Sequence, residues 1–427
     1  MNKLFLAGSA LENYRRTRID PRLCAICRGK GLCGLSYCPL LAKKTATYKL
    51  RRIHGSQEVF GSSPPAVFVG RYGYPYVNIG PSAPPETGDT KIYDLPEKWL
   101  GLRIEQILDY RWSLVTGSRK YPVRKRSDPF LEKIHEIVLS LKPVDVEIYL
   151  EKPPRPTILF SEYEPPQGPR APLKDFRIAS NPSIPKVLDK VYNDLYLKAS
   201  EAIIVLYKAG MPVSVIQKVL SVGALGTYMD RRLVPTRWSI TAVDDTISKY
   251  LINKIKQYNV INSIEVYMRK YYDNLFIAIL YPGKWSFEWM EAWWPGSTWN
   301  PGDTEIIVEG DYEGYKGRKT YPEIGGCYFA TRLAVAEHLE RRKRQAIAIV
   351  LREIYPGFNL PIGVWFVREN IRAMLRQGPV LKTNDIKEVL EFINMHTKLG
   401  VKKWLNASRL LQRILFYNTI DKYIEKG

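Results

Sequence analysis

Histidine and cysteine are scarce in this sequence, which has four His and five Cys among 427 residues. The histidines form neither an H-E-x-x-H motif nor the spacing of a catalytic triad, so we assign none of them a catalytic role. The chain also lacks a G-x-x-x-x-G-K-[ST] phosphate loop. Five cysteines are too few to make a disulfide scaffold. These absences exclude H-E-x-x-H zinc proteases, P-loop nucleotidases and disulfide-rich secreted domains.

Long hydrophobic runs are missing as well. The longest apolar stretches, at 202–207 and 275–281, have six or seven residues, whereas about 18–20 are needed to cross a bilayer. The first eleven residues are not followed by a small-residue cleavage pattern, so we interpret them as part of the fold. We expect a cytoplasmic protein without a membrane partner.

Acidic side chains are outnumbered, since 64 Lys and Arg face 43 Asp and Glu and leave a net charge of +21. The imbalance is local too, because no acidic residue lies between Asp20 and Glu58, a stretch with eight Lys and Arg. Such a surplus indicates a polyanionic partner, most often nucleic acid. The alternative is a proteome that is simply rich in lysine. The apolar fraction of 45% is that of a folded globular protein.

The order of expected elements predicts an α+β (mixed α/β) fold, with mixed sheets, packed helices and a small zinc-stapled module at the N-terminus. We expect a hairpin over 66–79, helices over 102–115, 130–141, 186–209, 212–222, 243–258 and 326–344, strands over 144–150 and 346–354, and a β-meander over 262–294. Residues 118–126 are expected to form a basic loop, and 151–185, with nine prolines, an extended connector. The predicted modules are 1–60, 61–300 and 301–427.

Four of the five cysteines form the pattern Cys24-x2-Cys27-x5-Cys33-x4-Cys38. Thiolates suit tetrahedral Zn²⁺, and the x2 spacing lets two of them reach one ion from a tight turn. A site with four thiolates has no open position, so we expect a structural zinc ion. An iron–sulfur cluster and free thiols are the alternatives. The fifth cysteine, Cys327, is expected to be a small core residue.

A second motif is the run Pro-Thr-Arg-Trp-Ser-Ile-Thr-Ala-Val-Asp-Asp at 235–245. Cationic and hydroxyl side chains precede the predicted helix, whose N-terminus favours phosphate. Trp238 offers a stacking surface beside them. The candidate phosphate ligands of a nucleotide or a phosphodiester are Arg237, Ser239 and Thr241.

Two adjacent carboxylates, Asp244 and Asp245, end this run. Together they are able to hold a divalent metal ion or act as acid and base, so they are the candidate catalytic residues. The alternative for Asp244 is a capping box, in which Thr241 caps the helix and Asp244 is its third residue.

Two glycine-containing segments are further candidates for binding anions. At 70–75, Arg71 is able to meet a phosphate and Tyr72 to stack on a base. At 325–332, Gly326 opens a predicted helix whose first turns carry Arg332. The structural alternatives are an ordinary hairpin tip and a tightly packed helix start.

Together, the cysteine pattern and the segments at 68–75, 234–245 and 325–332 resemble the archaeal Nre family. The resemblance covers roughly residues 20–410. It implies an archaeal cytoplasmic protein with a role in DNA repair, in which 61–300 and 301–427 are the N- and C-terminal Nre domains. It does not by itself imply a chemical reaction.

We therefore expect a zinc-containing DNA-repair protein that binds DNA or nucleotide phosphates through a basic and aromatic site. One rival is an enzyme with a closed pocket that binds or hydrolyses an adenine nucleotide or NAD. Another is a non-enzymatic adaptor that recruits repair proteins. If the chain is an enzyme, we expect a hydrolase, either a metal-dependent phosphodiesterase or a nucleotide or NAD hydrolase.

Some Nre members resemble partners of the sliding clamp through a C-terminal Q-x-x-h-x-x-a-a peptide. Counted from Gln412, the hydrophobic position here is Leu415, but the two aromatic positions fall on Asn418 and Thr419. We therefore do not expect clamp binding through this tail.

Overall fold

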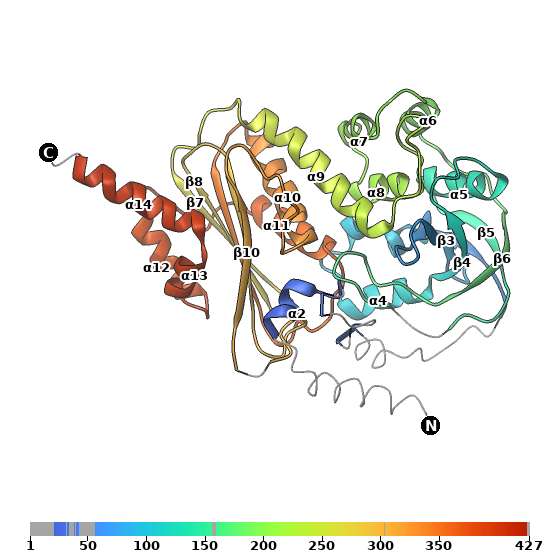
Figure 1. The fold of residues 1–427 in the computed structure, drawn as a ribbon, viewed down its shortest axis with the longest axis horizontal. Helices are drawn as coiled ribbons and strands as arrows, with labels where there is room; N and C mark the ends of the chain where they lie inside the picture. The colour runs from blue at the N-terminus through green and yellow to red at the C-terminus, as the bar shows by residue number, and fades with distance from the viewer. Residues whose placement is uncertain are drawn as a thin grey trace. The chain divides into compact units, whose positions relative to one another are not determined.

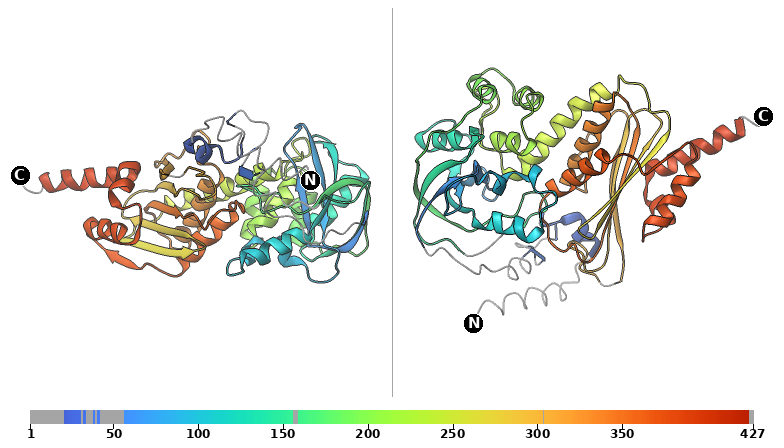
Figure 2. Two further views of the ribbon diagram at one scale, coloured as in Figure 1. Left: turned by 90° about the horizontal axis from the view of Figure 1, so that it is seen from below. Right: turned by 180° about the vertical axis from the view of Figure 1, so that it is seen from behind.

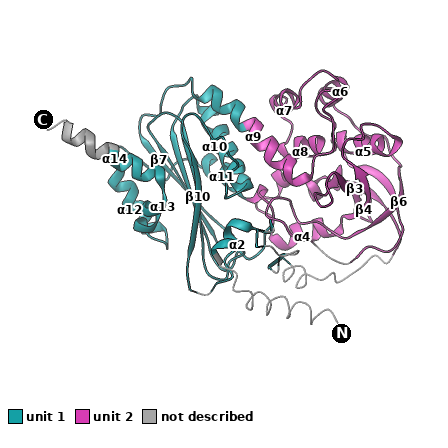
Figure 3. Ribbon diagram, viewed as in Figure 1, with its two compact units in different colours: residues 1–42, 248–361, 367–427 teal, residues 43–247, 362–366 magenta. Residues whose placement is uncertain are grey.

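The computed structural model describes residues 21–30, 32–33, 38, 40–41, 56–155, 159–302 and 304–424. Five of the eight Lys and Arg between Asp20 and Glu58, at 43–52, lie outside these ranges. The chain divides into two compact units that are discontinuous in sequence, whereas the predicted modules are consecutive. Unit 1 comprises 1–42, 248–361 and 367–427, and unit 2 comprises 43–247 and 362–366 (Figure 3).

Unit 2 is built on a six-stranded mixed sheet with the order β1-β5-β6-β4-β3-β2. Strands β4 and β6 run parallel, and the other neighbouring pairs are antiparallel. The strands are β1 (Glu58–Ser63), β2 (Ala66–Val69), β3 (Tyr76–Ala83), β4 (Val115–Pro122), β5 (Val144–Leu150) and β6 (Arg170–Ile178). Gly80 permits the close approach of β3 to β4, because a Cβ atom there would lie 1.7 Å from the Gly117 carbonyl oxygen.

The helices of unit 2 are short. They are η1 (Lys91–Asp94), η2 (Pro96–Lys98), α4 (Ile104–Ser113), α5 (Pro129–Leu139), α6 (Lys186–Asn193), α7 (Ala199–Lys208), α8 (Val213–Ser221) and the first half of α9 (Thr236–Ile255). Helix α5 packs on β2, β3 and β6, where the rings of Phe130 and Phe176 meet edge to face at 5.7 Å. One face of the sheet is therefore covered by this helix.

The opposite face of this sheet carries polar and aromatic side chains. Side chains alternate between the two faces of a strand, and Asn78 on β3 pairs with Lys120 on β4 while the next pair contains the buried Ile79. Tyr76, Asn78 and Lys120 are exposed, and Arg170 at the start of β6 is half-buried. We call these four residues the open face of unit 2.

Unit 1 contains a second mixed sheet, with the order β10-β9-β11-β8-β7-β12, in which β9 and β11 run parallel. The strands are β7 (Ile264–Tyr271), β8 (Asn274–Tyr281), β9 (Ser286–Trp293), β10 (Ile307–Glu313), β11 (Ile347–Ile354) and β12 (Leu381–Thr383). The helices are α2 (Pro21–Cys27), α10 (Gly326–Arg342), α11 (Trp365–Arg376, from Val367), α12 (Ile386–His396), α13 (Val401–Ala407) and α14 (Arg409–Ile424).

Helices cover both faces of the unit 1 sheet (Figure 1). On one side, Trp404 and Leu411 of α13 and α14 pack with Ile277 and Leu351 of β8 and β11 in a continuous apolar core. On the other side lie α10, which is buried along most of its length, and α11. The right-hand view of Figure 2 shows the same three layers from behind. Burial of both faces explains the long apolar runs of β8 and β11.

The predicted α+β class is confirmed by these two mixed sheets and their helices. Three local predictions are wrong. The helix expected over 186–209 is two helices, because the Asp194 carboxylate accepts the N–H groups of Tyr196 and Leu197 in a turn. The basic loop at 118–126 is strand β4 as far as Pro122, and the connector at 151–185 contains β6. No helix in the described ranges is long and apolar enough to span a membrane.

Candidate nucleic-acid interface

The hairpin motif and the Pro-Thr-Arg-Trp motif, which are more than 160 residues apart in sequence, meet in unit 2. The N–H of Val69, at the end of β2, donates to Oγ1 of Thr236, the first residue of α9, at 3.0 Å. The rings of Tyr74 and Trp238 are in contact, with centroids 5.2 Å apart and planes tilted by 54°. The fold thus places the first turn of α9 against the turn between β2 and β3.

Four large rings remain exposed at this junction. The exposed fractions are 74% for Tyr72, 47% for Tyr74, 54% for Tyr76 and 44% for Trp238. Such rings are costly to leave in water, so a group of them on one surface indicates a binding site. Bases of unpaired nucleic acid stack on rings of this kind. We call these four residues the ring platform.

Cationic groups lie beside the ring platform. The Arg71 guanidinium sits 4.5 Å from the centroid of the Tyr72 ring, and the Lys120 ammonium sits 6.0 Å from that of Tyr76. Arg237 is half-buried, with its guanidinium 3.8 Å from the ring of Tyr163. An aromatic face attracts and orients a cation held over it.

The two hydroxyl residues predicted to bind phosphate are used within α9. Ser239 is fully buried and its hydroxyl donates to the carbonyl of Thr236 at 2.9 Å. The Thr241 hydroxyl donates to the carbonyl of Trp238 at 3.1 Å. Both side chains therefore satisfy the backbone of their own helix in this structure.

The predicted capping box at Thr241 is wrong, because α9 begins five residues earlier, at Thr236. Asp244 consequently lies inside the helix, where it is fully buried and accepts a hydrogen bond from Nε2 of Gln217 on α8 at 2.9 Å. Asp245 is half-buried. A catalytic role for the pair stays a prediction, since no three Asp, Glu, His or Cys side chains among the described residues are grouped to hold a metal ion.

The residues predicted at the second helix start belong to unit 1 and are buried. Gly326 opens α10 after Gly325, whose φ of 81° suits glycine. The Arg332 guanidinium is buried, pairs with Glu313 at 2.8 Å and donates to Oγ of Ser248 at 3.0 Å. This burial leaves Arg332 tied to the interior of unit 1.

The cysteine segment is described only in part. The N–H of Leu32 donates to Sγ of Cys27 at 3.2 Å. The pKa of the Cys38 thiol is raised by burial, with smaller contributions from the thiols of Cys27 and Cys33. Among the described residues no three Cys, His, Asp or Glu side chains are grouped to hold a metal ion.

A buried arginine connects this segment to the sheet of unit 1. The guanidinium of Arg28, the residue after α2, lies 2.6 Å from a carboxylate oxygen of Glu291 on β9, and both side chains are fully buried. Arg352 of β11 reaches the other oxygen of Glu291 at 2.7 Å. One carboxylate thus holds two arginines from different parts of unit 1.

Comparison with known proteins places the chain in a family. The family description "Archaeal Nre, N-terminal" matches residues 32–300, and "Archaeal Nre, C-terminal" matches residues 313–423. The chain belongs to the archaeal Nre family. The resemblance expected from the sequence is confirmed at this level. No solved structure matches the chain significantly.

Curated relatives cover most of this Nre chain. "DNA repair protein NreB" of Archaeoglobus fulgidus is 48% identical over 390 residues, which is 91% of this chain and 97% of the relative. "DNA repair protein NreA" of the same organism is 37% identical, covering 83% and 89% of the two chains. "DNA repair protein NreA" of Haloferax volcanii is 39% identical, covering 74% and 77%.

Sequence reasoning missed a basic cleft on the open face of this Nre chain. The cleft measures about 730 Å³ and its lining includes Lys120, Lys152, Arg155 and Arg170. Arg170 lies within the expected proline-rich connector at 151–185, and Lys120 lies within the expected basic loop at 118–126. A prediction that β4 and β6 are neighbouring strands would have placed Lys120 and Arg170 on the same part of the sheet.

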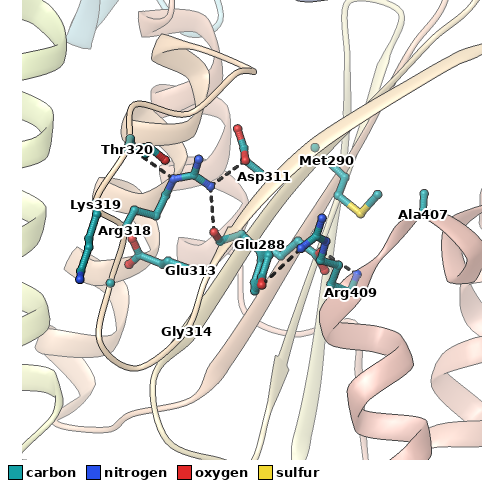
Figure 4. Close-up of a pocket in the computed structure, with 13 residues that line it drawn as sticks. Glu288, Met290, Asp311, Glu313, Gly314, Arg318, Lys319, Thr320, Ala407 and Arg409 are labelled. Carbon is teal, nitrogen blue, oxygen red and sulfur yellow. Dashed lines mark hydrogen bonds and ion pairs between the residues drawn. The ribbon is translucent and has the colours of Figure 1, made fainter.

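A second hollow, of about 370 Å³, lies in unit 1 (Figure 4). Most of its charged groups have partners within the fold, whereas Lys319 is exposed. Arg318 pairs with Asp311 at 2.6 Å, and Glu288, whose pKa is raised by burial, accepts hydrogen bonds from Ser408 and from the N–H of Arg409 at 2.5 and 2.8 Å. We interpret this hollow as structural, because its carboxylates anchor neighbouring elements.

Proposed function

We propose that this chain is an archaeal DNA-repair protein that binds single-stranded DNA on the ring platform of unit 2. The names of its Nre relatives support the role in repair. The observation that carries the binding proposal is the contact between the exposed rings of Tyr74 and Trp238, with the exposed rings of Tyr72 and Tyr76 in the same turn and at the start of β3. The net charge of +21 adds general attraction for a polyanion.

Single-stranded DNA suits this surface better than a duplex. The faces of unpaired bases are available to rings, whereas paired bases in a duplex are stacked on each other and present only their edges. Stacking is tolerant of sequence, because every base has an aromatic face. A repair protein with this surface would bind DNA that has lost its base pairing, whatever the base sequence.

The rival function, a closed nucleotide pocket, has no supporting geometry in the described residues. The closed-pocket function requires Arg332 to bind a phosphate of the nucleotide. The guanidinium of Arg332 is instead buried against Glu313 and Ser248. Asp244 is likewise occupied by Gln217. An adaptor role is compatible with the DNA-binding surface and is part of the same proposal.

The proposal is tested by titrating the full-length protein into a fluorescent oligonucleotide at several salt concentrations. Each phosphate contact on single-stranded DNA contributes about −0.7 to the slope of log K against log salt, so three to five contacts predict a slope of about −2 to −3.5. A duplex of the same length is expected to bind more weakly. A flat salt response with tight binding of free nucleotides would support the pocket enzyme instead.

We further propose that Cys24, Cys27, Cys33 and Cys38 hold a structural zinc ion. The four thiols are a donor set that zinc prefers, and the N–H of Leu32 is already directed at the sulfur of Cys27. Bound zinc would join the ends of the segment and so fix the turns between them.

Metal analysis of purified protein tests this proposal. We expect about one zinc ion per chain in the wild type and a strong loss in Cys27→Ser. Cys327→Ala is the matched control, because Cys327 is buried in α10 and should keep the full zinc content. Iron in place of zinc, or equal zinc in both variants, would contradict the assignment.

A further inference from the structure

The basic cleft lies on the open face of unit 2, beside the ring platform. Asn78 of β3, Lys120 of β4 and Arg170 and Pro172 of β6 are part of its lining. The segment that follows β5 forms one wall, held along β6 by hydrogen bonds from the N–H of Glu151 to Pro172 and from the N–H of Arg155 to Arg170, at 2.9 and 3.2 Å. The wall is therefore fixed by backbone pairing.

Cations dominate this cleft. Lys120, Lys152 and Arg155 are exposed, and none of them forms an ion pair within the described part of the chain. Glu151 is the single carboxylate in the lining. Like charges held this close repel one another, and a bound anion would relieve that repulsion.

Arg170 is a fixed cation in the cleft. Its guanidinium lies 4.1 Å from the centroid of the Phe68 ring. Its Nε atom is buried and has no hydrogen-bond partner among the described residues. Burial lowers the pKa of Arg170 to about 10, against partial compensation by Glu164, so the group stays charged at neutral pH. A buried N–H group without a partner carries a cost that a bound acceptor can remove.

The cleft and the ring platform are continuous along β3 and β4. Tyr76 belongs to the platform, and Asn78, two residues further along the same strand and on the same face, lines the cleft. Lys120 lines the cleft and also lies 6.0 Å from the centroid of the Tyr76 ring. A strand with bases stacked on the rings would thus bring a neighbouring phosphate to the cleft.

We propose that this cleft is a phosphate subsite for the single-stranded DNA whose bases stack on the ring platform, with Arg170, Lys120 and Lys152 as its cationic ligands. This inference rests on the proposed function and extends it. The rings would supply stacking that is nearly independent of salt, and the cleft would supply contacts that weaken as salt rises.

Binding of a fluorescent oligonucleotide to full-length variants tests the subsite. The double variant Lys120→Gln/Lys152→Gln changes only exposed side chains and is expected to bind roughly tenfold more weakly, with the salt slope shallower by about 1.4 for two lost contacts. Arg170→Gln is expected to lose affinity as well. Lys186→Gln/Lys190→Gln on α6, which changes two exposed lysines outside the cleft lining, controls for the general loss of two positive charges.

Two outcomes separate this inference from the proposed function, and two others identify the kind of phosphate that the cleft binds. Wild-type affinity and slope in both cleft variants, with binding still lost when the rings are removed, would overturn the subsite and leave the proposed function standing. Absence of binding by the wild type would overturn both. If a 5′-phosphorylated oligonucleotide binds more tightly than its 5′-hydroxyl form, and the cleft variants abolish the difference, the subsite takes a terminal phosphate. Equal binding of the two forms, weakened by the cleft variants, assigns an internal phosphodiester.

Discussion

Replacing Tyr74 and Trp238 together by alanine is expected to weaken the binding of single-stranded DNA by about 5- to 150-fold, since one stacked base is worth about 1–3 kcal/mol by alanine substitution. The two rings touch each other, so their effects should not be additive and the double variant is the informative one. Both are about half exposed, and the change should leave the thermal midpoint of unfolding nearly unaltered.

Tyr196→Ala is the matched control for this prediction. Tyr196 is 92% exposed in the turn between α6 and α7 of the same unit, and it is not part of the ring platform. Its loss should leave DNA binding unchanged. Equal DNA affinities of the double variant, the control and the wild type would contradict binding of DNA on the ring platform.

A second large effect is expected at Glu291, whose removal should destabilise unit 1. Glu291→Ala leaves the buried guanidinium groups of Arg28 and Arg352 without their shared carboxylate. Breaking a buried pair by removing one partner typically costs about 3–5 kcal/mol, because an uncompensated charge stays buried. We expect a clearly lower denaturant midpoint in urea unfolding of the full-length protein.

The exposed pair of Arg22 and Glu305 supplies the comparison. These side chains are 67% and 71% exposed and lie 3.3 Å apart, so Glu305→Ala should cost less than about 1 kcal/mol. Arg22 and Arg28 belong to the same N-terminal segment, which makes burial the main difference between the two tests. Similar midpoints for the two variants would show that the Glu291 pairs add little net stability.

Elements set by local pattern were predictable from the sequence. The hairpin at 66–79 forms, with β2 and β3 pairing antiparallel, and the helix and strand expected at 326–354 appear as α10 and β11. Each of these elements has a local pattern, such as alternating apolar residues, turn glycines or helical spacing, that is complete within a short stretch of sequence. The family was also predictable, because its motifs are contiguous in sequence.

Features that depend on tertiary contacts were not predictable in this way. Helix α9 begins at Thr236, whose hydroxyl accepts a hydrogen bond from the N–H of Val69. The capping pattern at Thr241 is local in sequence and therefore predicted a start that is five residues too late. The sequence gives no sign that Arg332 is part of an ion pair, because its partner Glu313 lies on a separate strand. Arg170 gains its environment from β4 and Phe68, which are distant in sequence.

The most direct measurement is a map of photo-crosslinks between the full-length protein and a single-stranded oligonucleotide carrying 5-iododeoxyuridine. Mass spectrometry of the digested complex would identify the attached peptides. The account predicts crosslinks to Tyr72, Tyr74, Tyr76 or Trp238, all within unit 2. Crosslinks confined to peptides of unit 1, such as those from 264–354, would contradict the claim that DNA binds on the ring platform.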